Sequence, residues 1–239
     1  MGNNWPLRGG KQTDFEGGIR TVGFVGGGFL NSARSPTPKT KTVRDQYVHA
    51  SDWYPTLCTL AGGHDCFDTV TAAARKVPAV DGFDMWPYLA GSNATSPRTE
   101  IMVARCQLPT KDDPPISKGS PDCSGAIIVG EYKLIVGMQG YAFWQGPVYP
   151  NASTTNAARK KFEKFFDCGA GCLFNIMDDP SETNNLADAM PSKRDAMWKR
   201  YVELNATQFD APKLNVNANE CNAYRTAHGG SVGPYIQKQ

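Results

Sequence analysis

From residue 100 onward, four short runs with the composition of β-strands follow one another, and they constrain the fold more than any other feature. They are separated by Gly, Pro and Asp, and they cover residues 100–104, 126–129, 132–137 and 171–177. Runs of this kind predict an antiparallel meander. Pro191 then opens a helix in which Met197, Tyr201 and Leu204 form an apolar stripe. We therefore expect one amphipathic helix to pack across a small sheet.

The preceding part of the chain predicts an α/β layer. Residues 19–25 have the β-branched and aromatic content of a buried strand, and three glycines end this run. A helix should follow, with Ser51 as its N-cap and Gly62 as its C-cap. One face of that helix carries Trp53, Leu57 and Leu60. A strand followed by a helix is typical of α/β folds.

The charge balance excludes two classes of partner. The chain has 25 Lys and Arg residues against 23 Asp and Glu residues, and no basic run alternates with aromatic residues. We expect neither nucleic acid nor an anionic membrane as a partner. The longest mostly apolar stretch, residues 22–30, contains several glycines and is far shorter than the roughly 20 residues that span a bilayer. No segment is therefore expected to cross a membrane.

Sequons and cysteines indicate a secretory protein. Three Asn-x-Ser/Thr triplets begin at Asn93, Asn151 and Asn205, among polar or turn-forming neighbours; chance is the alternative explanation for each. Six cysteines are spaced to close short loops in an oxidising compartment, as the candidate pairs Cys58 with Cys66, Cys106 with Cys123, and Cys168 with Cys172. Cys221 is left over. This odd cysteine and the lack of a signal peptide at residue 1 predict a missing amino-terminal segment.

Several other chemical signals are weak. Cys58, His64 and Cys66 offer three zinc ligands, but no fourth lies near them, so a disulfide is favoured. Acidic pairs that a cation might attract stand next to prolines, which favours turns; they are residues 112–113 and 178–179. The three histidines of the chain lack the context of a Ser-His-Asp set.

Five phrases of the sequence resemble one family. They are GNNWPLRGGK at residues 2–11, EGGIR at 16–20, HASDWYPTL at 49–57, DGFDMW at 81–86, and LFNIMDDPSETNNLA at 173–187. In this order and spacing they resemble the downstream half of an arylsulfatase, closest to the arylsulfatase B group. The resemblance covers most of residues 2–190.

The resemblance implies a divalent-cation-dependent sulfatase. Residues 1–98 would be the carboxyl-terminal part of an alkaline-phosphatase-like α/β catalytic domain, residues 99–209 a small antiparallel α+β subdomain, and residues 210–239 an irregular tail. In this family the nucleophile is a formylglycine made from the cysteine of a Cys-x-Pro-x-Arg motif, and acidic residues hold calcium. Neither that motif nor the family's Asp-Asn calcium pair is present in this sequence. We therefore expect both to belong to a missing amino-terminal half of the same protein, and the chain alone to be inactive.

One active-site residue of the family matches this chain. Lys11 stands where these enzymes place the lysine that contacts the sulfate, and an ammonium group suits that task because it can neutralise sulfate oxygens. Arg8, Glu16 and Arg20 are expected to be loop anchors and ion-pair partners. Gly10 replaces the basic residue that the family pattern has there. The aromatic residues Trp144 and Tyr149 are candidates for a substrate rim, although an aromatic core is the simpler interpretation.

The leading hypothesis is a sulfuric ester hydrolase that acts on a sulfated small molecule or glycan in the secretory pathway, outside the cell or in the lysosomal lumen. A second hypothesis is a non-catalytic secreted glycoprotein that binds glycans through the small sheet. A third keeps the superfamily and changes the ester to phosphate. The upstream nucleophile distinguishes the third hypothesis from the first, since cysteine favours sulfate whereas Ser or Thr favours phosphate.

Overall fold

The computed structural model describes residues 4–27, 43–107, 124–144, 165–207 and 218–230. The chain divides into two compact units, residues 1–208 and residues 209–239. The first unit contains the four-stranded sheet and most of the helices. Among the residues described in it, the second contains one helix.

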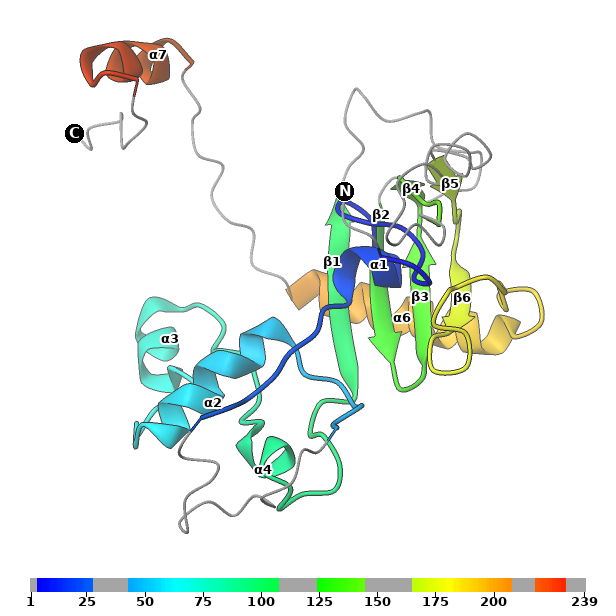
Figure 1. Ribbon diagram of the computed structural model, residues 1–239, viewed down its shortest axis with the longest axis horizontal. Coiled ribbons are helices and arrows are strands. Elements are labelled where there is room, and N and C mark those ends of the chain that lie inside the picture. Colours follow the sequence, from blue (N-terminus) through cyan, green and yellow to red (C-terminus); the bar gives the residue numbers. More distant parts are fainter. Residues whose placement is uncertain (1–3, 28–42, 108–123, 145–164, 208–217, 231–239) are drawn as a thin grey trace. The chain divides into compact units, whose positions relative to one another are not determined.

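The predicted meander is confirmed. Its strands are β1 (Glu100–Gln107), β2 (Ser124–Val129), β3 (Tyr132–Val136) and β6 (Cys172–Asn175). They lie in the order β1-β2-β3-β6, and each pairs antiparallel with its neighbour (Figure 1). Val129 and Tyr132 are paired across a tight turn in which Gly130 has a φ of +58°, a conformation that favours glycine.

One face of this sheet is covered by the helix predicted from Pro191. It is α6 (Pro191–Thr207), and its buried Met197 and Tyr201 belong to the same apolar cluster as Leu134 and Val136 of β3. Because side chains alternate along a strand, Lys133 and Ile135 of β3 must point to the opposite face.

The amino-terminal segment covers that opposite face. Phe15 is fully buried in a second cluster with Ile135 and Phe174, and Ile19 of the short helix α1 (Glu16–Ile19) packs against it. Two further short strands, β4 (Met138–Gly140) and β5 (Phe165–Asp167), pair antiparallel beside the main sheet. The sequence interpretation missed this pair, because three-residue strands leave too little periodicity to read.

Residues 19–25, predicted to form a buried strand, do not form one. Ile19 ends α1, and residues 20–25 belong to no strand and are all exposed; Val22 and Phe24 are each 93% exposed. The composition of the run suits a strand, but a strand also needs partners for its backbone, and the described part of the chain supplies none.

The predicted helix at residues 51–62 is largely confirmed. It consists of a 3-10 turn, η2 (Ala50–Asp52), followed by α2 (Trp53–Leu60), and Gly62 follows the helix with a φ of +80°. The predicted N-cap is wrong, because Ser51 lies inside the 3-10 turn. The His49 side chain accepts a hydrogen bond from the Ser51 N–H, and Asp52 accepts one from the His49 N–H.

Two more helices complete the described part of this unit. They are α3 (Thr69–Arg75) and α4 (Trp86–Leu89). In the second unit, α7 (Ala218–Ala227) lies in the tail predicted to be irregular, so that prediction is wrong. Among the described residues, no helix combines the length and apolar character that crossing a membrane requires.

The fold is therefore a mixture of helices and an antiparallel sheet, as expected for the second part of the chain. The alkaline-phosphatase-like assignment of residues 1–98 and the domain boundary after residue 98 stay predictions.

Candidate functional site

Lys11 lies at the tip of a turn that the rest of the segment holds in place. Lys11 and Gln12 are exposed, whereas Gly10 and Thr13 on either side of them are buried. The Thr13 N–H and hydroxyl both donate to the Gly10 carbonyl, at 3.0 and 2.9 Å. The ammonium group of Lys11 is therefore carried into solvent by a backbone whose base is fixed.

Gly9 anchors the base of this turn. Its N–H donates to the Phe143 carbonyl at 3.0 Å, which joins the turn to the segment after β4. Gly9 has a φ of +74°, and a Cβ at this position would lie 2.4 Å from the Thr13 hydroxyl oxygen. The glycine is required both by the left-handed backbone and by the close packing.

The glycines after Glu16 have a similar explanation. The Gly17 N–H donates to the Arg8 carbonyl at 2.7 Å. A Cβ on Gly17 would lie 2.5 Å from the carbonyl oxygens of both Arg8 and Gly9. The EGG phrase thus lets α1 lie directly against the backbone that leads to Lys11.

Arg8 is an anchor, as predicted. Its guanidinium donates to the carbonyls of Ala142 and Glu182, at 2.8 and 3.2 Å. Three aromatic rings surround it, with centroids 4.1 to 4.4 Å from the guanidinium carbon, and they belong to Phe15, Trp144 and Phe166. Burial lowers the pKa of Arg8 to about 10, so it stays charged at neutral pH, and the rings offset part of its lost hydration.

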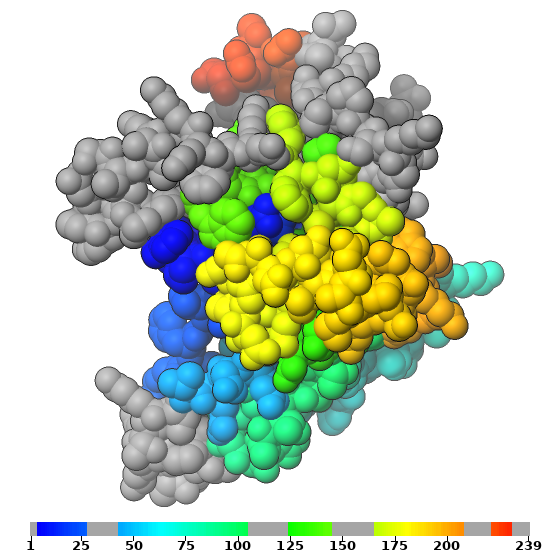
Figure 2. Space-filling view, turned by 90° about the vertical axis from the view of Figure 1, so that its right-hand side faces the viewer, coloured from blue at the N-terminus to red at the C-terminus, as the bar shows by residue number. Residues whose placement is uncertain are grey.

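Trp144 takes part in this anchor. It is half-buried, and its indole N–H donates to the Ser181 carbonyl at 2.7 Å. This contact favours the core interpretation over the substrate rim. In Figure 2 the amino-terminal segment (dark blue) borders the turn after β6 (yellow) that contains Ser181. The other rim candidate, Tyr149, lies outside the described residues.

A buried ion-pair cluster lies between the sheet and α1. The Lys133 ammonium is 2.8 Å from Glu182 Oε1 and 3.0 Å from Glu16 Oε1, and the Lys133 and Glu182 side chains are fully buried. The Glu16 N–H also donates to Glu182 Oε2 at 2.6 Å. The ion-pair role predicted for Glu16 is thus confirmed. Arg20 pairs with Glu16 more loosely, at 3.9 Å and with 56% of its side chain exposed.

Burial dominates the electrostatics of Glu182. It raises the pKa of this carboxyl to about 7, although the Lys133 ammonium and the Glu16 N–H work in the opposite direction. Burial likewise raises the pKa of Asp14, against the effect of its hydrogen bond with Gln139. Glu182 is therefore poised to change charge near neutral pH.

Lys133 and Glu182 were missed as site residues by sequence reasoning. Lys133 stands in the apolar run of β3, where the period of two places it on the buried face with Ile135. A charge at such a position signals a buried partner. Its two glutamates are far away in the sequence, so the pattern could not identify them.

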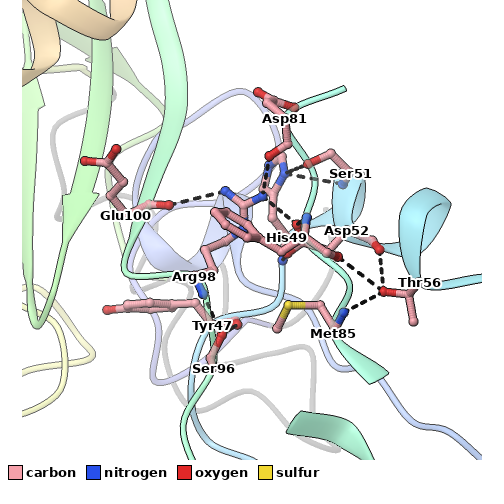
Figure 3. Close-up of polar contacts among 11 residues, drawn as sticks. Tyr47, His49, Ser51, Asp52, Thr56, Asp81, Met85, Ser96, Arg98 and Glu100 are labelled. Atoms are coloured by element: carbon pink, nitrogen blue, oxygen red, sulfur yellow. Dashed lines mark hydrogen bonds and ion pairs between the residues drawn. The ribbon is translucent and has the colours of Figure 1, made fainter. Parts of the chain in front are cut away.

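A second polar network holds residues 47–56 against residues 81–100 (Figure 3). Asp52 is fully buried and pairs with Arg98 through both carboxylate oxygens, the Nε–Oδ2 distance being 2.8 Å. Burial alone would raise the pKa of Asp52, but the hydrogen bonds from Arg98 and from the Phe83 and His49 N–H groups outweigh it and lower the pKa.

His49 belongs to this network rather than to a catalytic set. Its Nδ1 lies 2.8 Å from the Ser51 hydroxyl, while Asp52 turns to Arg98 (Figure 3). Burial, followed by the nearby Arg98 charge, lowers the pKa of His49, which therefore stays neutral at pH 7. The arrangement stabilises the start of α2.

Two of the three expected disulfides are confirmed. They join Cys58 to Cys66 and Cys168 to Cys172, and the first removes two of the three candidate zinc ligands. The side chains of Cys106 and Cys123 lie outside the described residues. Cys221 has a free thiol.

The sequons differ in their surroundings. Asn93 is exposed after α4, and Asn205 is half-buried in the last turn of α6. Asn151 lies outside the described residues. Among the residues that the structure describes, no group of three His, Cys, Asp or Glu side chains could hold a metal ion.

No family model matches the chain. Over its whole length the chain is 31% identical to mouse Arylsulfatase J, in an alignment of 252 residues, and it spans 37% of that protein's length. A solved structure from work on glycosaminoglycan metabolism by Bacteroides thetaiotaomicron is 18% identical and covers 65% of this chain and 24% of its own, with a TM-score of 0.36. A score that low supports no argument. Over its full length the chain is therefore similar to an arylsulfatase, which agrees with the sulfatase family that its five phrases resemble.

Proposed function

We propose that this chain takes part in the hydrolysis of a sulfate ester and that Lys11 is its contribution to the active site. One observation carries the proposal. Lys11 is the exposed tip of a turn whose base is buried, hydrogen-bonded and joined through Arg8 and Glu16 to the ion-pair cluster at Lys133. A lysine that needed only hydration would not require such support.

The chemistry follows from the charge. A lysine ammonium carries three donors and a full positive charge, so it can neutralise sulfate oxygens in the ground state. As the ester bond breaks, negative charge grows on the leaving oxygen, and a fixed ammonium stabilises that state more than the substrate. The hydrogen bonds of Gly9 and Arg8 support this role because they fix the backbone position from which the Lys11 side chain extends.

Calcium and formylglycine, which the family implies, have no place among these residues. The described residues offer no cluster that suits a metal ion, and no cysteine of the chain begins a Cys-x-Pro-x-Arg motif. We therefore propose that the described residues hold neither group and that the chain alone does not hydrolyse sulfate esters. The whole protein would act on a sulfated small molecule or sugar in a secretory or lysosomal compartment. The exposed Asn93 suits a glycan there.

The test compares the chain alone with the chain co-produced with the part of mouse Arylsulfatase J that it does not match. Hydrolysis of 4-nitrophenyl sulfate is measured for both. We expect none from the chain alone. In the complemented sample we expect Lys11→Ala to lower kcat/KM by about a hundredfold or more, as loss of one charge-stabilising donor does.

Lys199→Ala is the matched control, because Lys199 is exposed on α6 and should leave the rate unchanged. Turnover by the chain alone above its Lys11→Ala variant would overturn the proposed inactivity. Equal rates for the complemented wild type and Lys11→Ala would overturn the role of Lys11.

A further inference from the structure

The two ends of the segment that carries Lys11 are both bound to Glu182. Before the turn, the Arg8 guanidinium donates to the Glu182 carbonyl at 3.2 Å. After the turn, the Glu16 N–H donates to Glu182 Oε2 at 2.6 Å. Glu182 is fully buried, so bulk water does not compete for either contact. The backbone and the side chain of one residue thus hold both ends of residues 8–16.

The backbone of Glu182 is left-handed, with a φ of +52°. This conformation is unfavourable for a glutamate, and glycine or asparagine adopts it more readily. A residue kept in an unfavourable conformation needs compensating contacts, and here both the carbonyl and the carboxyl group have them. The glutamate is therefore explained by what its side chain binds rather than by the shape of the turn.

The turn that contains Glu182 has its own hydrogen bonds. The Asp179 carboxylate accepts from the N–H groups of Thr183 and Asn184, both at 2.8 Å. The Asp179 carbonyl accepts from the Glu182 N–H at 3.0 Å. These bonds fix the backbone on both sides of Glu182. Glu182 is thus a rigid support for the segment that contacts it.

The tip of the Lys11 turn depends on such a support. Lys11 and Gln12 are both exposed, so burial does not hold them in place. Gln12 has a φ of +79°, which adds a second unfavourable backbone conformation next to Lys11. The position of Lys11 is therefore set by the base of the turn, where the contacts to Glu182 lie.

We propose that Glu182 is a positioning residue that fixes the place of the Lys11 ammonium by holding both ends of residues 8–16. Because Glu182 is fully buried, it acts through Lys11 rather than on the substrate. The proposal rests on the proposed function, since it is for sulfate that Lys11 is positioned. The Lys133 ammonium, 2.8 Å from Glu182 Oε1, orients the carboxyl group so that Oε2 faces the Glu16 N–H.

Two uncharged substitutions separate positioning from the shape of the turn. Glu182→Gln keeps the length of the side chain and an oxygen that can accept from the Glu16 N–H. Glu182→Asn removes one methylene group, so its amide no longer reaches that N–H, although asparagine suits the left-handed backbone better. A role limited to the shape of the turn predicts that the Asn variant is the more stable one. A positioning role predicts that only the Asn variant releases the Lys11 segment.

Hydrogen–deuterium exchange on the full chain compares the two variants. In the Asn variant the amides of Thr13 and Gly17 should exchange about tenfold faster than in the Gln variant, because the hydrogen bonds at the base of the turn open more often. The amide of Ile127, in the middle of β2, should exchange equally in both. Equal rates at Thr13 and Gly17 would overturn the proposal. So would an equal acceleration at Ile127, because Glu182 would then stabilise the whole unit.

A double-mutant cycle tests whether Glu182 acts through Lys11. In the complemented sample, Glu182→Asn should lower kcat/KM for 4-nitrophenyl sulfate by about tenfold relative to Glu182→Gln, because the ammonium is misplaced. In a Lys11→Ala background the two variants should have the same rate, because no ammonium is left to position. The same loss in both backgrounds would refute positioning through Lys11. A Lys11→Ala rate equal to the wild type refutes the proposed function instead, and the exchange at Thr13 then decides whether Glu182 fixes this segment.

Discussion

The ammonium of Lys133 lies 2.8 Å from Glu182 Oε1, and neither side chain is exposed to solvent. Lys133 comes from the middle of the meander and Glu182 from the turn after its last strand. With Glu16 at 3.0 Å, this contact connects the sheet to the segment that carries Lys11. The cluster therefore couples the stability of the sheet to the position of that segment.

Lys133→Met should destabilise the first unit strongly. The variant keeps the apolar stem but leaves Glu16 and Glu182 buried without a cation, a change that typically costs about 3–5 kcal/mol in the free energy of unfolding. Urea unfolding followed by tryptophan fluorescence measures it. Lys199→Met, at an exposed position on α6, should change the same quantity by less than about 0.5 kcal/mol. Similar losses for both variants would contradict the assigned role of Lys133.

The titration of Glu182 should make the free energy of unfolding depend on pH. Its pKa rises from 4.5 to about 7 on folding, so between these values the folded protein keeps a proton that the unfolded chain releases. The contribution of Glu182 is therefore fully present below pH 4.5, and it is lost as the pH rises through about 7.

Glu182→Gln should flatten this slope, because the amide does not titrate. Denaturant unfolding at a series of pH values from 4.5 to 8 measures it. Glu131→Gln is the control, since Glu131 is exposed in the turn between β2 and β3. If the Glu182→Gln and wild-type slopes coincide, the raised pKa is refuted.

Gly9→Ala should be more costly than Gly130→Ala. Both glycines have positive φ, and each substitution carries backbone strain of about 1 kcal/mol. Only at Gly9 does the new Cβ meet another group, the Thr13 hydroxyl at 2.4 Å; around Gly130 nothing lies within 4 Å. We expect a total loss of about 3 kcal/mol at Gly9. If the two variants lower the melting temperature equally, the turn at Gly9 accommodates the new Cβ without loss of stability, and the prediction is wrong.

Replacing Arg98, the ion-pair partner of Asp52, should change how the free energy of unfolding depends on pH. Because the folded-state pKa of Asp52 is lowered from 3.8, its stabilising contribution is present above that value and lost as the pH falls through the lowered pKa. Arg98→Met leaves the buried carboxylate unpaired and should cost about 3–5 kcal/mol at pH 7.

The loss from Arg98→Met should shrink toward pH 3, where protonation relieves the unpaired charge. Denaturant unfolding at both pH values checks this, with Arg75→Met on exposed α3 as the control. A cost independent of pH would mean that packing rather than charge explains the effect.

The two disulfides should differ in how much they contribute to the free energy of unfolding. Each closes a short loop, for which the entropic contribution is about 2 kcal/mol. Cys168 and Cys172 also lie in the apolar cluster beneath Phe15, so replacing both with serine buries two hydroxyls as well. The Cys168→Ser, Cys172→Ser protein should therefore have the lower urea midpoint when compared with Cys58→Ser, Cys66→Ser. The reverse order would contradict the buried placement.

Local sequence patterns predicted much of the fold. The four strands of the meander and α6 were identified because each depends on neighbours in the sequence: alternation within a strand, an apolar stripe along a helix, and turn residues between them. The family phrases predicted a sulfatase, and they also predicted an active-site role for Lys11, which stays a proposal. The pairs Cys58–Cys66 and Cys168–Cys172 were also predictable, because each closes a short loop.

The tertiary structure decided where charges are buried and which runs find partners. In the sequence, Lys133 is one residue among others in β3. Only the tertiary structure pairs it with Glu16 and Glu182, which come from remote parts of the chain. Residues 20–25 have the composition of a strand, but hydrogen bonds to other strands make a strand, and the described chain offers none. Side-chain patterns depend on residues that are neighbours in the sequence, whereas desolvation and backbone pairing depend on which distant segments come into contact in the folded protein.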